Sequence, residues 1–179
     1  YRSQRRGGRG VQGASSRDED FVEHLFIANT HSYILFFTDK GKCYWVKVYD
    51  IPEGGRAAKG RAIVNLIGCE PDEKVSAFIS VKEFNEDHYV VMATEKGMVK
   101  KTKLSAYSNP RKKGIYAVEI RDGDKLIEAR VSTGDNDIFL GTRNGKSIRF
   151  SEEQIRASGR KTMGVKGITL SSDDDRLVG

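Results

Sequence analysis

The chain has 179 residues but only two cysteines, three prolines and one tryptophan. Cys43 and Cys69 are too few to build a disulfide scaffold in a chain of this length, so we expect free, buried thiols in a reducing compartment. No apolar run approaches the length of a membrane span, and residues 1–17 lack the apolar core of a signal peptide. We therefore expect a cytoplasmic protein without a membrane partner.

Acidic residues are absent from residues 1–17, although this segment contains five arginines. The net charge of the whole chain is +6, so the rest of the chain carries only +1. Positive charge concentrated in one segment is typical of proteins that bind a polyanion. The apolar content of 37% is sufficient for a folded core beyond that segment.

Motifs for catalysis are also missing. The sequence has no P-loop, and His24, His31 and His88 are not at metal-binding spacing with the cysteines. Most tyrosines lie in strand patterns and are interpreted as packing residues. Trp45 is interpreted in the same way, with base stacking as the alternative. We predict no catalytic residue, no metal site and no cofactor in this chain.

An internal repeat is the most informative feature. The segments FTDKGKCYWVKVYDI (37–51), ATEKGMVKKTKLSAY (93–107) and GTRNGKSIRFSEEQI (141–155) align without gaps. Each contains an apolar strand, a Thr-x-x-Gly turn and a second strand. The turn glycines, Gly41, Gly97 and Gly145, lie 56 and 48 residues apart. Glycine adopts positive φ at little cost, which hairpin turns require.

Two further landmarks follow each hairpin. A basic loop ends in Gly60, Gly114 or Gly164, and an apolar pair follows four and six residues later, which predicts a third strand. An acidic or polar turn then leads into a fourth strand, at 72–79, 123–131 and 173–178, and residues 18–28 match the same element one unit earlier. Helix signals are weak, and 151–157 is predicted to form at best a short turn.

Four-stranded units repeating at about 50 residues predict an all-β, propeller-like array whose sheets stack on their neighbours. We assign residues 1–17 to a basic Gly/Arg segment and residues 18–179 to about three blades. The repeats run roughly over 18–70, 71–120 and 121–179. The last strand stops just after it starts, so we expect the array to be truncated at its C-terminal end and the parent chain to be longer.

The segment QRRGGRG, residues 4–10, falls where the basic loop of the preceding unit should be, because Arg6 precedes Gly10 as Arg160 precedes Gly164. Three interpretations compete: a solvated basic end, a dinucleotide loop spelled by GRGVQG at 8–13, and a phosphate-binding loop. No apolar strand precedes GRGVQG and no helical pattern follows it, which argues against the dinucleotide loop. Arginine forks and glycine backbone N–H groups both suit phosphate, which favours the third interpretation.

QRRGGRG resembles the seven-residue box in the C-terminal DNA-wrapping domain of the DNA gyrase A protein, and all seven positions match. FIANTHSYILFFTDKG (26–41), IVNLI (63–67), MATEKGMVKKTKL (92–104) and GVKGITL (164–170) are also similar to that family. The resemblance implies a β-pinwheel, in which neighbouring blades exchange strands. It also implies a non-catalytic domain that wraps duplex DNA around a basic rim and presents a positive crossing for ATP-dependent negative supercoiling. The implied partners are double-stranded DNA, the remainder of the gyrase A protein, and the gyrase B protein of the same heterotetramer, at the bacterial nucleoid.

The predicted DNA-binding residues are those of the box and of the three basic loops. They are Gln4, Arg5, Arg6, Gly7, Gly8, Arg9, Gly10, Arg56, Lys59, Arg61, Arg111, Lys112, Lys113, Arg160, Lys161 and Lys166. Three lysines of one strand, Lys100, Lys101 and Lys103, are further candidates for the same rim. Wrapping also requires acids to lie on turns away from DNA, namely Asp72, Glu73, Asp122, Asp124 and Asp173–Asp175.

Two alternatives remain. The C-terminal domain of the topoisomerase IV A protein is the nearest, although the box is degenerate or missing in that family. The other is a propeller-like scaffold that binds proteins, with the Gly/Arg segment incidental. The intact box and the recurrence of basic loops favour the gyrase interpretation.

Overall fold

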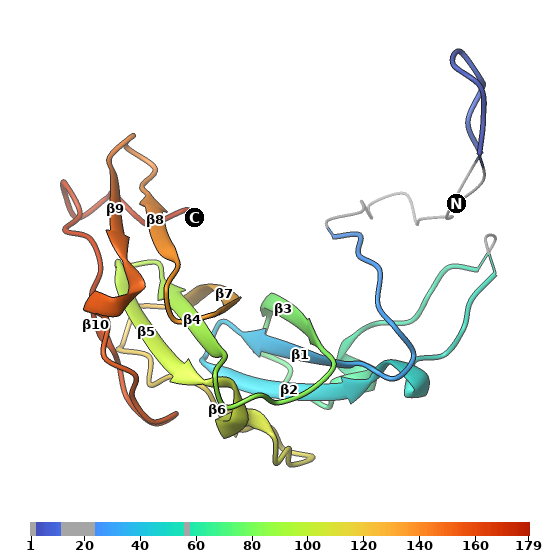
Figure 1. Ribbon diagram of the computed structural model, residues 1–179, viewed down its shortest axis with the longest axis horizontal. Helices are drawn as coiled ribbons and strands as arrows, with labels where there is room; N and C mark the ends of the chain where they lie inside the picture. Colours follow the sequence, from blue (N-terminus) through green and yellow to red (C-terminus); the bar gives the residue numbers. More distant parts are fainter. Residues whose placement is uncertain (1–2, 12–23, 56–57) are drawn as a thin grey trace.

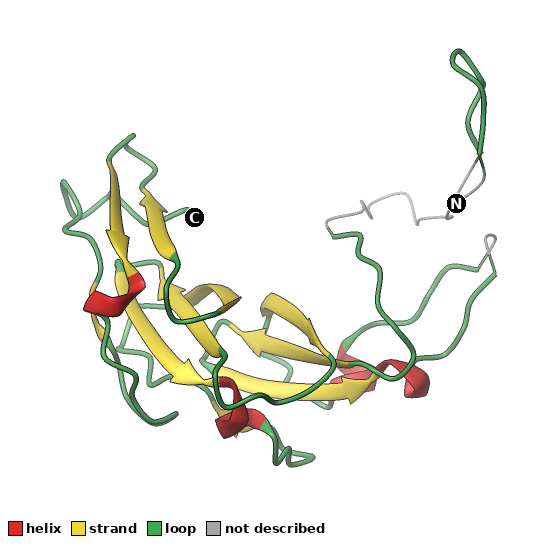
Figure 2. Ribbon diagram, in the orientation of Figure 1, coloured by secondary structure: helices red, strands yellow, loops and turns green. Residues whose placement is uncertain are grey.

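The computed structural model describes residues 3–11, 24–55 and 58–179. The elements are almost all strands, joined by long loops (Figures 1 and 2). The strands are β1 (Tyr33–Thr38), β2 (Lys42–Lys47), β3 (Val75–Val81), β4 (Tyr89–Thr94), β5 (Met98–Lys103), β6 (Ile115–Tyr116), β7 (Leu126–Ser132), β8 (Asp137–Gly141), β9 (Ser147–Ser151) and β10 (Val165–Lys166). One turn of α-helix, α1 (Val64–Ile67), and the 3-10 turns η1 (Val48–Asp50), η2 (Leu104–Tyr107) and η3 (Glu152–Gln154) complete the fold.

The three aligned segments form three antiparallel hairpins. They are β1–β2, β4–β5 and β8–β9, and the turn glycines have φ of 78°, 84° and 81°, as predicted. The threonine that opens each turn accepts a hydrogen bond from the glycine N–H through its carbonyl, at 2.9–3.1 Å. The hairpins are therefore built by the same local chemistry in each repeat.

Each blade combines strands from neighbouring repeats. Blade 1 has the order β3-β1-β2-β6, blade 2 has the order β10-β5-β4-β7, and blade 3 contains β8 and β9 (Figure 1). The chain forms the β4–β5 hairpin of blade 2 and then returns β6 to blade 1. It forms the β8–β9 hairpin of blade 3 and then returns β10 to blade 2. This exchange confirms the all-β pinwheel expected from the resemblance.

Two of the three core clusters among the described residues join side chains of neighbouring blades. Leu35 and Phe37 of blade 1 pack in one cluster with Val90 and Met92 of blade 2. A second cluster joins Val99 of blade 2 to Leu140 of blade 3, together with Ile155, Ile168 and Leu177. The third cluster lies within blade 1, on the other face of its sheet, and contains Ile34, Phe36, Tyr44 and Ile67. A single sheet leaves an apolar face exposed, and the first two clusters show successive blades covering such faces by stacking, as the repeat predicts.

The third and fourth strands differ partly from the expectation. The apolar pairs Val118/Ile120 and Ile168/Leu170 do pack into the cores, but the paired strands β6 and β10 are two residues long and precede them. Val64 and Leu66 lie in α1 instead of a strand. β6 and β10 form by pairing with the hairpin of the blade before, whereas α1 closes on itself and ends at Gly68, whose φ of 61° stops the helix.

The fourth strands of the first two repeats are present as β3 and β7, while residues 173–178 form a turn and a single bridge between Leu177 and Thr142. Residues 24–28 are not a strand, and residues 18–23 lie outside the described part of the chain.

Cys43 is buried, but Cys69 is half-buried, and both are free. No helix among the described residues is long and apolar enough to cross a membrane.

Candidate nucleic-acid interface

The box forms a small loop closed by its own atoms. The Gly8 N–H donates to the Arg5 carbonyl at 3.0 Å, and the Gly10 N–H donates to Gln4 Oε1 at 2.9 Å. Gly7 and Gly10 have φ of 81° and 75°, and a Cβ on Gly8 would lie 2.7 Å from Gln4 Oε1. The backbone geometry of the box thus favours glycine at each of these three positions. The loop leaves the side chains of all three arginines exposed.

The second basic loop, residues 111–114, is anchored on blade 1. The Gly114 N–H donates to the Arg111 carbonyl at 2.8 Å, and Gly114 has a φ of 73°. A Cβ on Gly114 would lie 2.7 Å from the Tyr44 ring, so the backbone lies directly on that buried side chain. Arg111, Lys112 and Lys113 are exposed, as predicted for a phosphate-facing loop.

The third basic loop, residues 160–166, is anchored on blade 2. Gly164 has a φ of 81°, and a Cβ there would lie 2.2 Å from the Val99 carbonyl oxygen. Lys161 and Lys166 are exposed. Arg160 is half-buried, and its Nη1 donates to the Tyr116 carbonyl at 3.3 Å. Part of the charge predicted for this loop is therefore held against its neighbour rather than directed freely into solvent.

The structure brings the second and third loops together. Besides the Arg160–Tyr116 contact, the Glu119 N–H donates to the Thr162 carbonyl at 3.0 Å, and Arg121 Nε lies 3.3 Å from Met163 Sδ. The segment that follows the second loop, residues 116–121, thus runs along the third loop.

The first basic loop is described only in part. Lys59 and Arg61 are exposed beside Gly60, which has a φ of 69°, and Arg56 lies outside the described residues. Within the described ranges, no hydrogen bond or ion pair joins this loop to the second loop.

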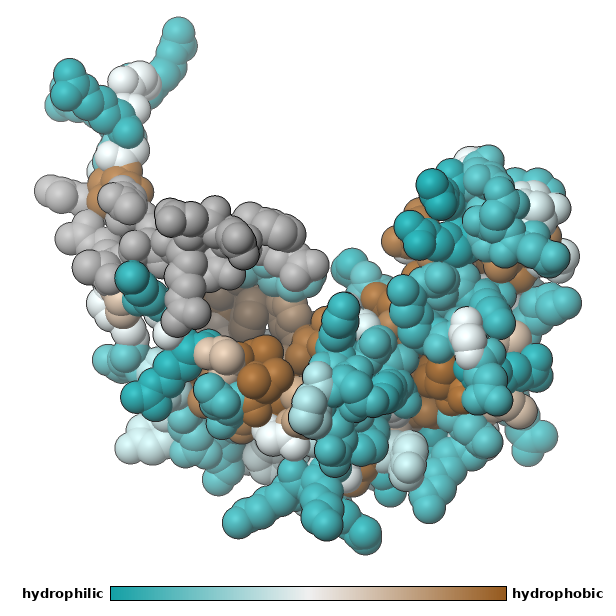
Figure 3. All heavy atoms as spheres, turned by 180° about the vertical axis from the view of Figure 1, so that it is seen from behind, coloured by the Kyte–Doolittle hydropathy of each residue, from teal (hydrophilic) through white to brown (hydrophobic). Residues whose placement is uncertain are grey.

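Hydrophilic side chains cover most of the face seen in Figure 3, with apolar patches in the hollow between the two ends of the molecule.

Two lysines expected on the rim are buried. Lys100 and Lys101 are 1% and 6% exposed, whereas Lys103 is exposed and pairs with Glu86 at 3.5 Å. The expectation for the first two is wrong because the next repeat covers β5: β10 pairs with Met98 and Val99, and Ala157 forms a bridge to Lys101. Lys101 Nζ donates to the Glu152 carbonyl at 3.0 Å and lies 3.7 Å from its carboxylate.

The acids of the predicted turns make contacts within the blades. Glu73 is buried and accepts from the Tyr44 hydroxyl at 2.7 Å, and Asp72 pairs with Lys40. Asp124 accepts from the Lys96 N–H at 2.9 Å, as Asp175 does from the Asn144 N–H at 3.0 Å. These carboxylates hold the hairpin turns. Whether the acids as a group lie away from DNA stays a prediction.

The buried acid Asp175 illustrates how strongly such a turn is held. Burial alone would raise the pKa of its carboxyl, but hydrogen bonds from Ser171 and Asn144 outweigh that effect and hold the pKa well below its usual range. The carboxylate is therefore charged at neutral pH. Its oxygens accept hydrogen bonds within the blade, from the Asn144 N–H and the Ser171 hydroxyl.

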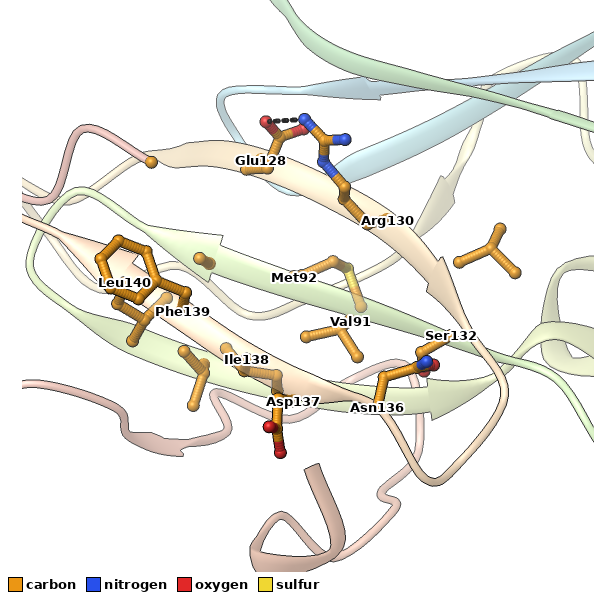
Figure 4. A pocket seen from close by; sticks show the side chains of 14 residues that line it. Val91, Met92, Glu128, Arg130, Ser132, Asn136, Asp137, Ile138, Phe139 and Leu140 are labelled. Atoms are coloured by element: carbon orange, nitrogen blue, oxygen red, sulfur yellow. Dashed lines mark hydrogen bonds and ion pairs between the residues drawn. The ribbon is translucent and has the colours of Figure 1, made fainter. Parts of the chain in front are cut away.

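A cavity of about 430 Å³ lies between blades 2 and 3 (Figure 4). Its lining is mainly apolar, with Met92, Ile138 and Leu140 among the contributors, while Glu128 and Arg130 pair at its margin at 3.4 Å. None of the predicted DNA-binding residues lines it. No group of three or more His, Cys, Asp or Glu residues suited to a metal ion occurs in the described ranges.

Sequence reasoning missed the anchoring residues. Lys100 stands three residues after its turn glycine, as Tyr44 does, and Tyr44 is buried. The repeat alignment places Lys100 at the position of the buried Tyr44, and this is the signal in the sequence that could have shown Lys100 to be interior. Tyr116, interpreted as a packing residue, is 53% exposed beside the second loop, and Tyr49 is also exposed. Trp45 does pack in the core region, edge-on to Tyr33 with ring centroids 4.8 Å apart.

A family model described as the DNA gyrase C-terminal domain, beta-propeller, matches residues 1–29, 32–82, 88–133 and 136–179. The chain belongs to this DNA gyrase C-terminal domain family. The successive matches begin at 32, 88 and 136, which reproduces the spacing of the turn glycines. The first match, residues 1–29, contains the whole box.

Curated relatives agree. The chain is 51% identical to the A protein of DNA gyrase from Clostridium acetobutylicum over 93% of its length and 55% identical to that from Neisseria gonorrhoeae over 97%. It spans only about a fifth of those relatives, 20% and 19% of their lengths. Among solved structures, the C-terminal domain of DNA topoisomerase IV superposes with a TM-score of 0.82 at 30% identity, over 94% of this chain and 52% of that one.

Proposed function

We propose that this gyrase-family domain binds duplex DNA without regard to base sequence and wraps it along the box and the basic loops. The observation that carries the proposal is the box, a self-closed loop that leaves Arg5, Arg6 and Arg9 exposed together. Bidentate guanidinium groups recognise phosphate oxygens. Glycines let the backbone approach the same anions closely.

The second and third loops add exposed cations on two blades. Contacts to phosphates at several separated points, with no base readout, are what bending DNA around a protein requires. Because most of the net charge lies in residues 1–17, wrapping depends on where the cations are placed rather than on the total charge of the blades.

In the intact enzyme, the wrapped DNA would present a positive crossing to the strand-passage machinery. The domain itself supplies no catalytic group or cofactor in this proposal. Cleavage, ATP turnover and strand passage belong to the remainder of the gyrase A protein and to the gyrase B protein, and the outcome is negative supercoiling. The chain covers about a fifth of its gyrase A relatives, which is consistent with one domain of a larger protein.

The test measures affinity for long duplex DNA over a salt series and the linking number of nicked circles religated in the presence of the chain. We expect a shift of linking number and a steep salt dependence. In R5A/R6A/R9A the shift should be lost, and the slope of log K against log salt should fall by about 0.9 for each phosphate contact removed.

The matched control is K40A/K47A/K125A, which removes three exposed positive charges of the blades that are not among the predicted DNA-binding residues. It should retain wrapping. If both triple variants lose binding equally, net charge rather than the box drives the interaction. If the wild-type chain does not bind DNA at moderate salt, the proposal is wrong and the protein-binding scaffold becomes the better interpretation.

A further inference from the structure

The buried ammonium of Lys100 joins two of the basic loops. Lys100 Nζ donates to the Ala117 carbonyl at 2.7 Å and to the Arg160 carbonyl at 2.5 Å. Ala117 directly follows β6, which comes after the second loop, and Arg160 opens the third loop. A single group in β5 thus contacts two segments that are 43 residues apart in sequence. The segment at Arg160 begins the loop that leads to β10 of blade 2.

Surrounding contacts make Lys100 the centre of this junction. The Ala117 N–H donates to the Gly41 carbonyl of blade 1 at 2.8 Å, and the Tyr107 hydroxyl lies 3.4 Å from the Ala117 carbonyl. The Ser158 N–H donates to the Lys101 carbonyl at 2.8 Å. The second loop is therefore tied to blade 1, the third loop is tied to β5, and Lys100 connects the two.

The other hairpins use different residues at this position. In register, Tyr44 takes the place of Lys100 in blade 1 and Ile148 takes it in blade 3. Tyr44 donates instead to Glu73, which belongs to the acidic turn of its own blade. Burying an ammonium is costly unless it is well paired, so a lysine at this position points to a role that an apolar residue would not perform.

We propose that Lys100 is a positioning residue for DNA binding, which fixes the second and third basic loops relative to each other so that their cations meet successive phosphates. This proposal rests on the proposed function. Lys100 does not touch DNA itself, because the residue is 1% exposed. Without it, the two loops would have to be ordered on binding, and that ordering has a free-energy cost.

The test compares K100M with K47M in the whole chain. Both variants remove one lysine charge from a hairpin strand, but Lys47, at the end of β2, is exposed and is not among the predicted DNA-binding residues. We expect K100M to bind long duplex DNA about tenfold more weakly with an unchanged salt slope, and K47M to bind within about twofold of wild type. Hydrogen exchange should accelerate at residues 111–121 and 157–166 in K100M alone. If K100M does not fold, K100Q, which keeps N–H donors, takes its place.

Three results overturn the proposal. One is wild-type affinity in a folded K100M. Another is a salt slope reduced by about 0.9 in K100M, which would make Lys100 a phosphate contact. The third is weakened binding without faster exchange in either loop. Failure of the wild-type chain to bind DNA would instead reject the proposed function, so the two failures are distinguishable.

Discussion

The box and the blade loops use the same residue types but are held in place differently. The box is closed by its own Gln4 side chain and by a turn between Arg5 and Gly8. The loops at 111–114 and 160–166 lie on buried residues of the blades, Tyr44 and Lys100. A short Arg/Gly motif therefore specifies its own shape in the box, whereas the loops take theirs from the fold.

Glycine substitution should separate the two kinds of loop most strongly. Gly164 and Gly145 share a φ of 81°, but only at Gly164 would a Cβ meet backbone, at 2.2 Å. We expect G164A to lower the free energy of unfolding by about 3 kcal/mol or more, and G145A by about 1 kcal/mol, the strain of the backbone alone. G10A also places alanine at positive φ, but the described hydrogen bonds of the box are internal to it, so the strain should stay within the box and leave global stability unchanged. Urea denaturation measures all three.

Equal losses in G164A and G145A would contradict this expectation, because they would show that positive φ alone matters at both sites. Wild-type stability in G164A would mean that the third loop is not anchored against β5. A large loss in G10A would mean that the box is integrated with the blades in a way that its internal hydrogen bonds do not indicate.

A buried lysine and an exposed lysine should also differ, the first affecting the stability of the fold and the second affecting DNA binding. Lys101 is buried against Glu152, and its ammonium lies 4.9 Å from the centroid of the Tyr89 ring. We expect K101M to destabilise the chain by about 2–3 kcal/mol, because Glu152 loses its buried counter-ion but keeps other hydrogen-bond donors. We expect K112M, on the exposed second loop, to change stability by less than about 0.5 kcal/mol and to reduce the DNA salt slope by about 0.9.

Thermal or urea unfolding measures the stability of K101M and K112M, and the salt series measures their DNA binding. The distinction fails if K101M is as stable as wild type, or if K112M destabilises the chain while leaving the salt slope unchanged. A matched loss of DNA affinity in both variants, with normal stability in both, would place Lys101 on the DNA-binding surface.

The same distinction explains what can be predicted from the sequence. Thr-x-x-Gly turns and alternating apolar residues specify hairpins locally, so the sequence predicts all three hairpins with their turn glycines at positive φ. The box is recognisable because its function-bearing residues are contiguous. The burial of Lys100 and Lys101 is not predictable in this way, because it depends on β10 and residues 157–160 returning from the next repeat to cover β5.

Val64 and Leu66 illustrate a different limit. Their spacing matches the apolar pairs of the other repeats, yet they lie in a helical turn. In the other repeats, the backbone before the pair hydrogen-bonds to the hairpin of the preceding blade, as Lys42 and Tyr116 do across β2 and β6. Such pairing depends on a distant partner, and a local pattern cannot report whether that partner is present.

Removing the Gln4 side chain, the clip that closes the box by its hydrogen bond with Gly10, should have a smaller effect. Gln4 Oε1 accepts from the Gly10 N–H, and Q4A would leave the loop to be ordered only when DNA binds. A net hydrogen bond contributes about 1 kcal/mol, so we expect affinity for duplex DNA to fall about fivefold while global stability is unchanged. Q154A, which changes an exposed glutamine in η3, is the control. Equal affinity in Q4A and wild type would show that the clip is not needed for binding.

The smallest expected effect is the pH dependence of the Lys100 junction. Burial lowers the pKa of Lys100 from 10.5 to about 8, with Arg160 acting in the same direction and Glu119 opposing the shift. Between pH 8 and 10.5 the unfolded chain then binds more protons at this residue than the folded chain, so its contribution to stability rises with pH. Burial raises the pKa of Cys43, Tyr44 and Tyr107, whose ionisation destabilises the fold over the same range.

Comparing wild type with K100M isolates the lysine, because Cys43, Tyr44 and Tyr107 are present in both chains. We expect the difference in free energy of unfolding, wild type minus variant, to increase from about pH 7.5 to about pH 9.5 in urea denaturation. Parallel pH profiles would mean that the folded and unfolded chains titrate Lys100 alike, which would be inconsistent with a buried ammonium. The described hydrogen bonds of the box are internal to it and do not involve Lys100, so DNA contacts made by the box should not follow the same profile. The contrast between self-closed and fold-anchored loops would then appear in a titration.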